Sequence, residues 1–446
     1  MTVRRAFPLV WAVVCGALYA AVSLIRFGRM EVASYDNAIF EEAIRGYAHG
    51  GWPIVPIKGA GFNLLGDHFS PAIALIAPFY RLFPQPETLL IAQVVLIAVS
   101  IFVVASTGVR TLGLGWGGVV AIAYGLSFGL QSGVIADFHE VALGVPLLAL
   151  AGAAFVEQRY QAVVGWSLPL LLVKEDLGLT VAAVGVALFL VGERRRGLSL
   201  SIVGVVATGL TVFAFIPWAR ADQSGYAYGL GGEGLFAALA DDPGRKALTV
   251  LLTLAVGGVI AVASPWVVVA LPTLAWRFAA DNPYYWGTDW HYSLLLMPVM
   301  AMAAVDVMRR VVWSRKVALA GMGIVTVLAL VPNSVVDAPL VRYLSPEAFH
   351  TTQREEAGER VLELIPPGAT VESDIGLINR LVADGRFVTW IGTEDVERAP
   401  EWIVLDHDPS SNIGSPADAV EFAEGRYGGE YRTVLRADPF QVARRE

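Results

Sequence analysis

Residues 88–109, TLLIAQVVLIAVSIFVVASTGV, decide the fold because this run contains no charged side chain. A bilayer core about 30 Å thick is crossed by about 20 consecutive apolar residues in a helix, so the run predicts a membrane span. The whole chain has the same character, since 55% of its 446 residues are apolar or aromatic and its mean hydropathy is +0.58. Charged residues make up only 16%, against about 25% in a soluble globular domain. This composition excludes an ordinary soluble enzyme, a disordered chain and a nucleic-acid-binding protein.

Similar apolar runs continue through the first three quarters of the chain and predict about eleven transmembrane helices. They lie at 7–25, 88–109, 116–135, 141–156, 160–173, 177–192, 197–219, 247–263, 265–280, 292–308 and 317–336. Several runs are short, which indicates helices that end below the membrane surface and border a wet cavity. The segment 69–83 contains Pro71 and Pro78, and we interpret it as an interfacial or re-entrant helix. Residues 1–23 also allow a signal peptide, but the apolar run continues past them and favours an uncleaved anchor.

The distribution of charge divides the chain in two. Residues 1–336 hold 21 Lys and Arg and 19 Asp and Glu, whereas residues 337–446 hold 11 and 21 and lack long apolar runs. We therefore predict a transmembrane domain at 1–336, with a long first outer loop at 26–87, followed by a small soluble α/β domain at 337–446. Basic residues gather in the loops on the side of the N-terminus. Because such loops stay inside the cell, the N-terminus is expected to be cytoplasmic and the C-terminal domain extracytoplasmic.

The soluble domain shows an alternation of short strand-like and helical stretches that is typical of a small α/β fold. An amphipathic helix is predicted at 347–365. Strands are predicted at 369–372, 386–391, 401–406 and 430–436, with helices at 375–383 and 416–426.

Polar residues of the membrane domain concentrate on its predicted outer side, which holds 16 of its 19 acids and all four of its histidines. Three of these histidines lie within two residues of an acid, in the pairs Asp67–His68, Asp137–His139 and Asp289–His291. Ionisable groups at membrane depth are costly unless they line a cavity or pair with one another. We therefore predict one shared cavity on the outer side, although outer loops are polar in any membrane protein.

Two other loops of this side carry unusual residues. The segment 282–292 is rich in Tyr and Trp, on which sugar rings stack, but an aromatic belt at the membrane interface explains the same residues without a ligand. The loop 220–246 is rich in glycine and is predicted to be a linker rather than a lid.

Five short motifs appear in order along the chain: Tyr35-Asp36-Asn37-Ala38-Ile39-Phe40, Gly66-Asp67-His68-Phe69-Ser70-Pro71, Asp137-Phe138-His139, Lys174-Glu175-Asp176 and His291-Tyr292-Ser293. Together they resemble a family of uncharacterised prokaryotic multi-spanning membrane proteins that is defined only as a domain of unknown function. The resemblance covers nearly the whole chain, but this chain has Glu140 where we expect a proline.

That family in turn resembles the GT-C superfamily of polytopic glycosyltransferases, which take a sugar from a polyprenyl-phosphate carrier on the outer side of the membrane. The resemblance implies a GT-C-like fold and an acidic residue in the first outer loop, a place that Asp36 occupies. This step is an analogy of fold, and a fold does not determine a function.

Glycosyl transfer from a lipid phosphate needs a base for the acceptor hydroxyl and a cation or oriented donors for the leaving phosphate. Asp36 is the predicted base, with Asp67, His68, Asp137 and His139 as further catalytic candidates. Lys174 is the predicted phosphate partner, for which Arg29 or Arg45 could substitute. The predicted substrate-binding residues are Lys174, Glu175, Asp176, Tyr285, Trp286, Asp289, His291 and Tyr292.

Two of these motifs are also compatible with a purely structural role. Asp67 suits the N-cap of a helix that starts near Pro71, and Lys174-Glu175-Asp176 could be a self-neutralising cluster. Asp137, His139, Glu175 and Asp176 are candidate ligands for a divalent cation such as Mg²⁺ or Mn²⁺, because hard cations prefer carboxylates. Their spacing is no metal signature, so no cofactor is certain.

The function predicted from the sequence is transfer of a sugar from a polyprenyl-phosphate donor to an envelope acceptor, with membrane lipid as a partner. The alternative is a transporter or flippase for a polar or lipid-linked substrate, which favours internal repeats and charges near the midplane. A non-catalytic envelope scaffold leaves the paired histidines and acids unexplained. The C-terminal domain is expected to bind the acceptor or to gate the cavity.

Overall fold

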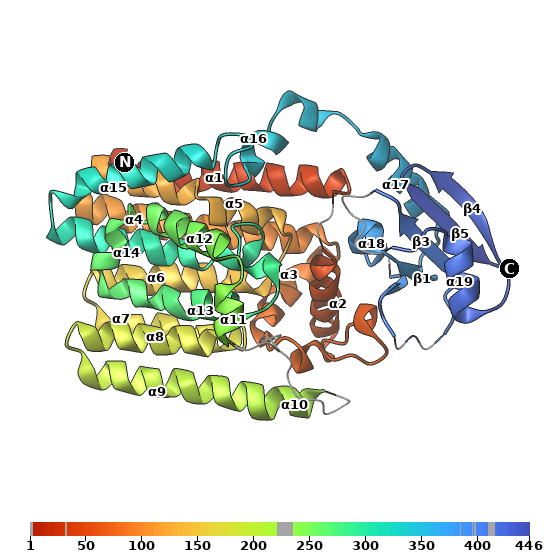
Figure 1. Ribbon diagram of the computed structural model, residues 1–446, viewed down its shortest axis with the longest axis horizontal. Helices are drawn as coiled ribbons and strands as arrows, with labels where there is room; N and C mark the ends of the chain where they lie inside the picture. Colours follow the sequence, from red (N-terminus) through yellow and green to blue (C-terminus); the bar gives the residue numbers. More distant parts are fainter. Residues whose placement is uncertain are drawn as a thin grey trace.

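The computed structural model describes residues 3–31, 34–220, 235–383, 385–394, 396, 398–408 and 415–446. Most of the predicted linker 220–246 lies outside the described residues. Figure 1 shows an elongated molecule in which a bundle of helices occupies one end and a small sheet the other. The mostly helical architecture and the C-terminal sheet agree with the predicted fold class.

Each of the eleven predicted apolar runs lies mainly on one helix or on two or three consecutive helical segments, and the last run, 317–336, extends past the helix that ends at Leu328. The helices of the bundle are α1 (Val3–Gly28), α4 (Glu87–Gly125), α5 (Phe128–Ile135), α6 (Gly144–Val156), α7 (Tyr160–Ser167), α8 (Leu177–Leu190), α9 (Arg194–Leu210), α10 (Ile216–Ala219), α11 (Leu235–Ala240), α12 (Pro243–Val256), α13 (Leu271–Ala279), α14 (Leu296–Arg310) and α15 (Ser314–Leu328). Among the residues that the structure describes, four helical segments are long and apolar enough to cross a membrane: Val3–Gly28, Glu87–Ile135, Arg194–Ala219 and His291–Arg310. The number of helices that cross stays a prediction.

α4 contains two of the predicted spans because it folds back on itself. Gly113 sits in its middle with a φ of 82°, outside helical geometry. Gly117 then packs so closely against the backbone of Gly108 that a Cβ atom could not fit between them. In a continuous helix these two residues would lie about 13 Å apart along the axis, so the segment is a hairpin of two helices.

Small residues let other helices approach as closely. α8 and α9 meet along Gly178, Gly185, Gly197 and Gly204, where an added Cβ would meet backbone or side-chain atoms of the facing helix. This is the packing that replaces the hydrophobic effect between helices in lipid. α14 forms the centre of the bundle, since every residue from Leu296 to Met308 is buried.

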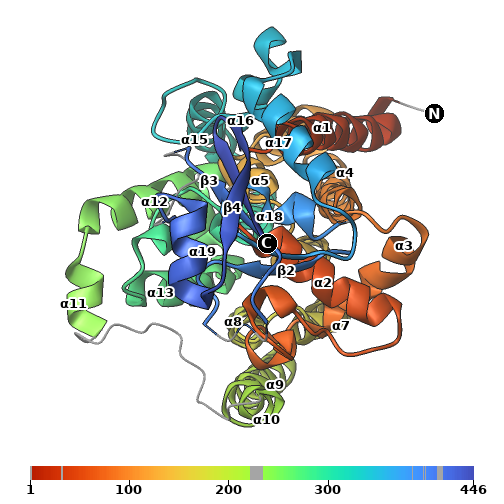
Figure 2. The ribbon, with the colours of Figure 1, turned by 90° about the vertical axis from the view of Figure 1, so that its right-hand side faces the viewer.

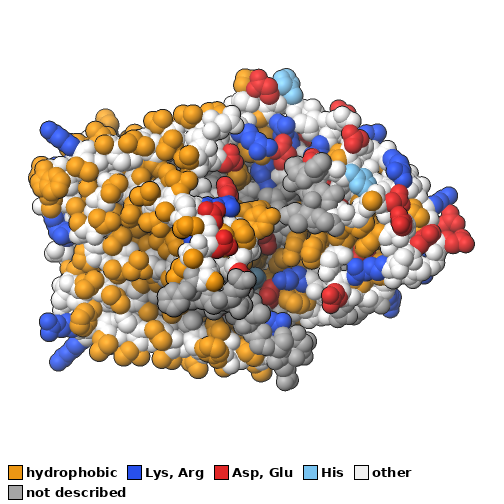
Figure 3. Space-filling model, viewed as in Figure 1, with side chains coloured by type: hydrophobic (Ala, Val, Ile, Leu, Met, Phe, Trp, Pro, Cys, Tyr) orange, Lys and Arg blue, Asp and Glu red, His pale blue; other side chains and the backbone are white. Residues whose placement is uncertain are grey.

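The two ends of the bundle differ in charge. At one end Arg4 donates hydrogen bonds to the carbonyls of Val109 and Arg110, at 3.1 and 3.2 Å, and Arg110 pairs with Glu157 at 2.7 Å. Figure 3 shows Lys and Arg side chains at this end, an apolar flank along the bundle, and mixed charges where the bundle meets the sheet domain.

The segment 26–87, predicted to be the first outer loop, covers the other end of the bundle. It contains α2 (Asp36–Ala48), the single turns η1 (Pro56–Lys58) and η2 (Leu64–Gly66), and the pair η3 (Pro71–Ile76) and α3 (Ala77–Leu82). The apolar pair spans only Pro71–Leu82, which is short of the roughly 20 residues that cross a bilayer. α2 lies across the end of the bundle rather than along it (Figure 1).

The C-terminal domain is a mixed five-stranded sheet with the order β2-β1-β3-β5-β4. Its elements are α16 (Pro339–Tyr343), η11 (Pro346–Phe349), α17 (Gln353–Leu364), β1 (Thr370–Ser373), α18 (Ile375–Leu381), β2 (Phe387–Trp390), β3 (Trp402–Asp406), α19 (Ala419–Tyr427), β4 (Tyr431–Ala437) and β5 (Phe440–Arg445). β1 pairs in parallel with β2 and β3, whereas β5 is antiparallel to β3 and β4. The sequence did not predict β5.

The sheet domain is docked on the first outer loop. The Tyr343 hydroxyl donates to Glu31 at 2.7 Å, and Arg354 donates to the carbonyl of Met30 at 2.9 Å. One contiguous apolar core runs from the bundle into the sheet and includes Val371 and Val388. Figure 2 shows the sheet, α18 and α2 overlying the end of the bundle.

Candidate functional site

A cavity of about 320 Å³ opens at the end of the bundle beside α2. Side chains from the first outer loop and from the ends of several helices line it. They are Asp36, Ile39, Phe40, Lys58, Asp67, His68, His139, Glu140, Lys174, Trp276, Tyr285, His291 and Tyr292. Distant stretches of the chain therefore meet in one cavity. Of the three acid–histidine pairs, Asp67–His68 lines it with both members, whereas the other two pairs contribute only His139 and His291.

Asp36 and His139 form the centre of this cavity. Asp36 is the first residue of α2, and its Oδ2 lies 3.3 Å from Nε2 of the nearly buried His139. Burial raises the pKa of Asp36, but the hydrogen bond and charge of His139 outweigh burial and hold that pKa well below its usual range. Its side chain is still 37% exposed, so a charged carboxylate faces the cavity.

The position of His139 is fixed from several sides. Its backbone N–H donates to Oε1 of Gln93 at 3.1 Å, and the Gln93 amide donates to the carbonyl of Asp137 at 2.8 Å. The His139 ring stacks on His291 with centroids 3.5 Å apart, and His291 contacts the Tyr292 ring at 4.2 Å. These contacts hold the His139 imidazole in one orientation, and the Asp36 carboxylate contacts this fixed ring.

Cationic groups occupy the neighbouring wall. Lys58 forms an ion pair with Asp67. His68 lies between two acids, with Nε2 3.7 Å from Asp67 and Nδ1 3.6 Å from Glu175. Burial lowers the pKa of His68, but the close Glu175 carboxylate and the charges of both acids raise it above its ordinary value. The Lys174 ammonium lies 2.8 Å from the Glu140 carboxylate. Glu140, which stands where the family resemblance predicts a proline, is therefore the counter-ion of Lys174.

Asp137, Glu175 and Asp176 lie behind the lining. Asp137 forms a buried ion pair with Arg26 and has a φ of 64°, an uncommon conformation for a residue other than glycine. Glu175 accepts a hydrogen bond from the Phe69 amide at 3.1 Å. Asp176 borders a separate cavity of about 20 Å³.

Two predicted substrate-binding residues lie elsewhere. The Trp286 indole is buried, donates to the carbonyl of Ala280 at 2.9 Å and packs under the ammonium of Lys246, 3.8 Å from the ring centroid. Asp289 pairs with Arg245 at 3.2 Å on the surface. Neither is among the residues that line the cavity. Arg29 and Arg45, the alternative phosphate partners, are also absent from its lining.

The sequence did not single out Lys58 or Trp276 as members of the site. Lys58 is one of only four lysines in the chain, and this rarity was the one feature of the sequence that could have indicated a role in the site. Trp276 lies inside the apolar run 265–280, where a tryptophan is expected in any membrane span and does not indicate a binding site.

The candidate metal ligands are engaged with different partners. Asp137 pairs with Arg26 and His139 with Asp36. Among the residues that the structure describes, no group of three or more His, Cys, Asp or Glu is arranged to hold a metal ion. A requirement for Mg²⁺ or Mn²⁺ stays a prediction.

An apolar groove of about 550 Å³ lies between η3, α3 and the first part of α4. It is lined mainly by Leu75, Phe79, Phe83, Ile91, Val95 and Leu96, with Leu143 at one side. Leu143 closes the turn η4 (Glu140–Leu143), which starts at the cavity residue Glu140. The groove is thus connected through one turn to the cavity wall.

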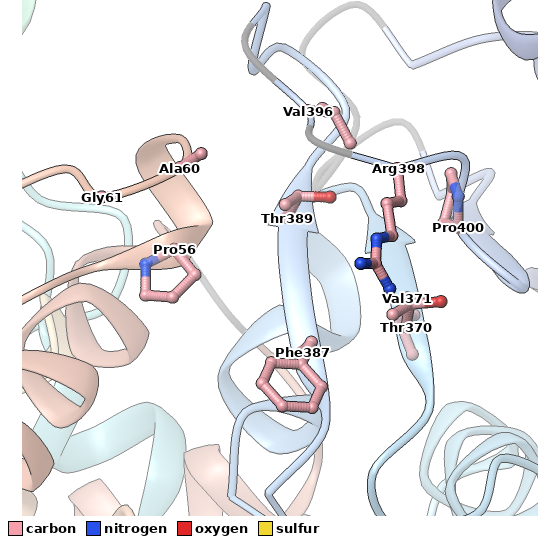
Figure 4. A pocket seen from close by; sticks show the side chains of 10 residues that line it. All are labelled: Pro56, Ala60, Gly61, Thr370, Val371, Phe387, Thr389, Val396, Arg398 and Pro400. Carbon is pink, nitrogen blue, oxygen red and sulfur yellow. The ribbon is translucent and has the colours of Figure 1, made fainter.

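A third cavity, of about 400 Å³, separates the first outer loop from the sheet domain. Pro56, Ala60 and Gly61 line one side, next to the cavity residue Lys58. Figure 4 shows the Arg398 side chain extending toward Thr370 and Val371 of β1, with Thr389 and Phe387 on β2. Phe387 is 63% exposed, so an aromatic face, hydroxyls and a guanidinium share one pocket.

Comparisons with known proteins agree with the expected resemblance. A family model described as "Predicted membrane protein (DUF2079)" matches residues 26–438. The fold is similar to the crystal structure of ArnT from Cupriavidus metallidurans bound to undecaprenyl phosphate, with a TM-score of 0.53, 12% identity and 97% of each chain covered. ArnT is a GT-C glycosyltransferase, and at this identity the likeness concerns the fold alone. No curated protein matches the chain.

Proposed function

The chain belongs to the DUF2079 family of predicted membrane proteins, and we propose that it is a GT-C-type glycosyltransferase that uses a polyprenyl-phosphate sugar donor. The observation that carries this proposal is a single cavity in which the Asp36 carboxylate faces Lys58 and His68 at the end of a membrane bundle. The fold it shares with ArnT, whose crystals contain undecaprenyl phosphate, supports the same class of donor.

We place the cavity on the extracytoplasmic side. Arg4, Arg110 and Arg159 gather at the opposite end of the bundle, and basic loops favour the cytoplasm. The transferred sugar is therefore received outside the cell, by an acceptor of the envelope.

The proposed reaction forms one bond and breaks one at the anomeric carbon of the sugar, and it moves one proton. The acceptor hydroxyl oxygen bonds to the anomeric carbon as the bond from that carbon to the carrier phosphate breaks. Asp36 takes the hydroxyl proton, which becomes acidic as the new bond forms, and His139 holds the carboxylate in place. Lys58, His68 and Lys174 stabilise the charge that builds up on the leaving phosphate.

The two further cavities suit the two substrates. The apolar groove beside α3 and α4 is a place for the polyprenyl chain, because its lining is apolar and its residue Leu143 ends the turn η4 that starts at the cavity residue Glu140. The cavity beside β2 is a place for the acceptor, because a sugar ring can stack on Phe387 and an acidic group can pair with Arg398.

A transporter remains the second candidate, but the packing of the bundle does not favour it. Transport requires a route between both faces. The central helix α14 is buried from Leu296 to Met308 and presses against α4 and α6. The titratable groups of the cavity also lie at one end of the bundle rather than near its middle.

The test is transfer from radiolabelled polyprenyl-phosphate sugars by the purified full chain in lipid nanodiscs, with and without EDTA. We expect Asp36→Asn to lower turnover by about 100-fold or more, because general-base assistance is worth that much. Asp281→Asn, an exposed acid outside the cavity lining, is the matched control and should be fully active. Turnover by the Asp36→Asn protein at the normal rate would remove Asp36 from the mechanism.

A further inference from the structure

We propose that the C-terminal domain is part of the catalytic apparatus, because Asn379 caps α2 from across the domain boundary and so positions Asp36. The consequence for catalysis rests on the proposed function, whereas the cap itself does not. Asn379 lies in α18, is fully buried, and is separated from α2 by more than 330 residues of chain.

The start of α2 needs an external partner. The first amides of any helix have no acceptor within it. The residue before α2, Tyr35, contributes no side-chain cap. The Ser34 hydroxyl reaches the Asp36 amide only at 3.4 Å.

The side-chain amide of Asn379 supplies such an acceptor and also donates a second hydrogen bond to the backbone before α2. Its Oδ1 accepts a hydrogen bond from the Ala38 N–H at 3.0 Å, and its Nδ2 donates to the carbonyl of Ser34 at 2.9 Å. The two bonds lie on either side of Asp36 in the sequence. They tie the residues before and after the carboxylate to one buried side chain.

Other contacts from the same domain hold the neighbouring residues. The Tyr35 ring stacks on Trp390, the last residue of β2, with centroids 5.2 Å apart and an interplanar angle of 22°. The Thr393 hydroxyl donates to the carbonyl of Ile57 at 2.8 Å, directly before Lys58. The sheet domain thus restrains the backbone next to two residues of the cavity lining, Asp36 and Lys58.

The cap acts on geometry rather than on the reacting atoms. Asp36 is the first residue of α2, so fraying of the first turn moves its carboxylate. His139 is fixed separately by Gln93 and His291, and it would not follow. A misplacement of about 1 Å at a reacting group can reduce the rate by about 100-fold. Asn379 touches neither group, and it is a positioning residue.

The experiment compares Asn379→Ala with Arg360→Ala, an exposed residue on α17 of the same domain. Hydrogen exchange of the full chain in nanodiscs is the first measurement. With Asn379→Ala we expect amides of 36–40 to exchange at least about tenfold faster, while those of β1 and β3 and of the Arg360→Ala protein are unchanged. Unchanged exchange at 36–40 would overturn the cap.

The second measurement reports on Asp36 without requiring turnover. ¹⁵N-histidine labelling gives ring-nitrogen signals from six imidazoles, of which the His139 Nε2 signal is assigned by its loss in His139→Gln. We expect Asn379→Ala to move this signal toward its position in Asp36→Asn, because both changes weaken the Asp36–His139 contact. An unmoved signal would overturn the positioning role, even if α2 frays.

Turnover separates this inference from the proposed function. In an active protein we expect Asn379→Ala to lower kcat by about tenfold or more with the donor KM within twofold, and an unchanged kcat would contradict positioning. If the wild-type chain transfers no sugar, the proposed function fails while exchange and the His139 signal still decide the cap. If Asn379→Ala does not fold, Trp390→Leu, which removes the stack on Tyr35, is expected to produce the same changes.

Discussion

Two acidic side chains flank His68, and they determine the pH at which its imidazole loses its charge. Because Asp67 and Glu175 raise its pKa, His68 stays protonated above the ordinary value of about 6.5. Its contribution to stability is therefore complete below that value and is lost as the pH rises through the raised pKa. The same loss removes a cation from the place where we propose that the donor phosphate binds.

We therefore expect the KM for the lipid donor to rise as the pH increases above the ordinary histidine value of about 6.5 and through the raised pKa of His68, because His68 deprotonates there. His68→Gln should have a high donor KM at all pH values and lack this rise. Donor saturation curves for both proteins across this range check the prediction. A wild-type KM that stays flat would show that His68 carries no charge in donor binding.

The buried pair of Arg26 and Asp137 supports the cavity from behind. Removal of one partner from a buried ion pair leaves an uncompensated charge and costs about 3–5 kcal/mol. We expect Arg26→Met to lower the unfolding temperature sharply, and the double variant Arg26→Met with Asp137→Asn to recover most of it. Thermal unfolding in nanodiscs is the measurement. Equal stability of the single and double variants would contradict the coupling.

At the scale of elements, the contact between α8 and α9 depends on glycine. A Cβ on Gly197 would lie 2.6 Å from the carbonyl oxygen of Gly185, whereas nothing lies within 4 Å of a Cβ on Gly209 of the same helix. We expect Gly197→Ala to destabilise the protein by about 1–3 kcal/mol through overpacking. Gly209→Ala is the matched control and should be neutral or slightly stabilising. Equal unfolding midpoints for the two variants would be the contrary result.

Hydropathy alone located the helices of the bundle except α11, which lies in the predicted linker 220–246. Apolar length is a property that each segment shows by itself. The gap between the predicted spans 88–109 and 116–135 agrees with the bend of α4 at Gly113. Hydropathy could not show how closely Gly117 approaches Gly108, because that approach is a tertiary contact. β5 was missed for a similar reason. Its sequence ends in Arg444 and Arg445, which lower the local hydropathy, and pairing with β3 and β4 makes it a strand.

The candidate site was predictable in part. Charged groups beside apolar runs are costly, and this cost pointed to four residues that the structure brings into one cavity: Asp36, His68, His139 and Lys174. Trp286 and Asp289 share a loop with Tyr285 and Tyr292 but face other partners, and a loop sequence does not encode which way each side chain points. The contact of Asn379 with α2 leaves no local signal, because its partners lie far away in the chain.

At the scale of the whole molecule, the separation of charge predicts how the chain sits in the membrane. Cys15 is the only cysteine and is buried, so added cysteines can be labelled selectively. We expect His350→Cys, in the sheet domain, to react with a membrane-impermeant maleimide on intact cells. Arg195→Cys, at the basic end, should react only after permeabilisation. The opposite pattern would place the cavity in the cytoplasm.

The docking of the sheet domain on residues 30–58 limits how this architecture can be rebuilt. Met30, Glu31, Ser34, Tyr35, Ala38 and Ile57 are all held by residues beyond position 340. A chimera that exchanges only the region after position 336 with a relative would join surfaces that did not evolve together. A working chimera therefore has to take two separate segments from the same parent: the region after position 336 and the segment that contains residues 30–58.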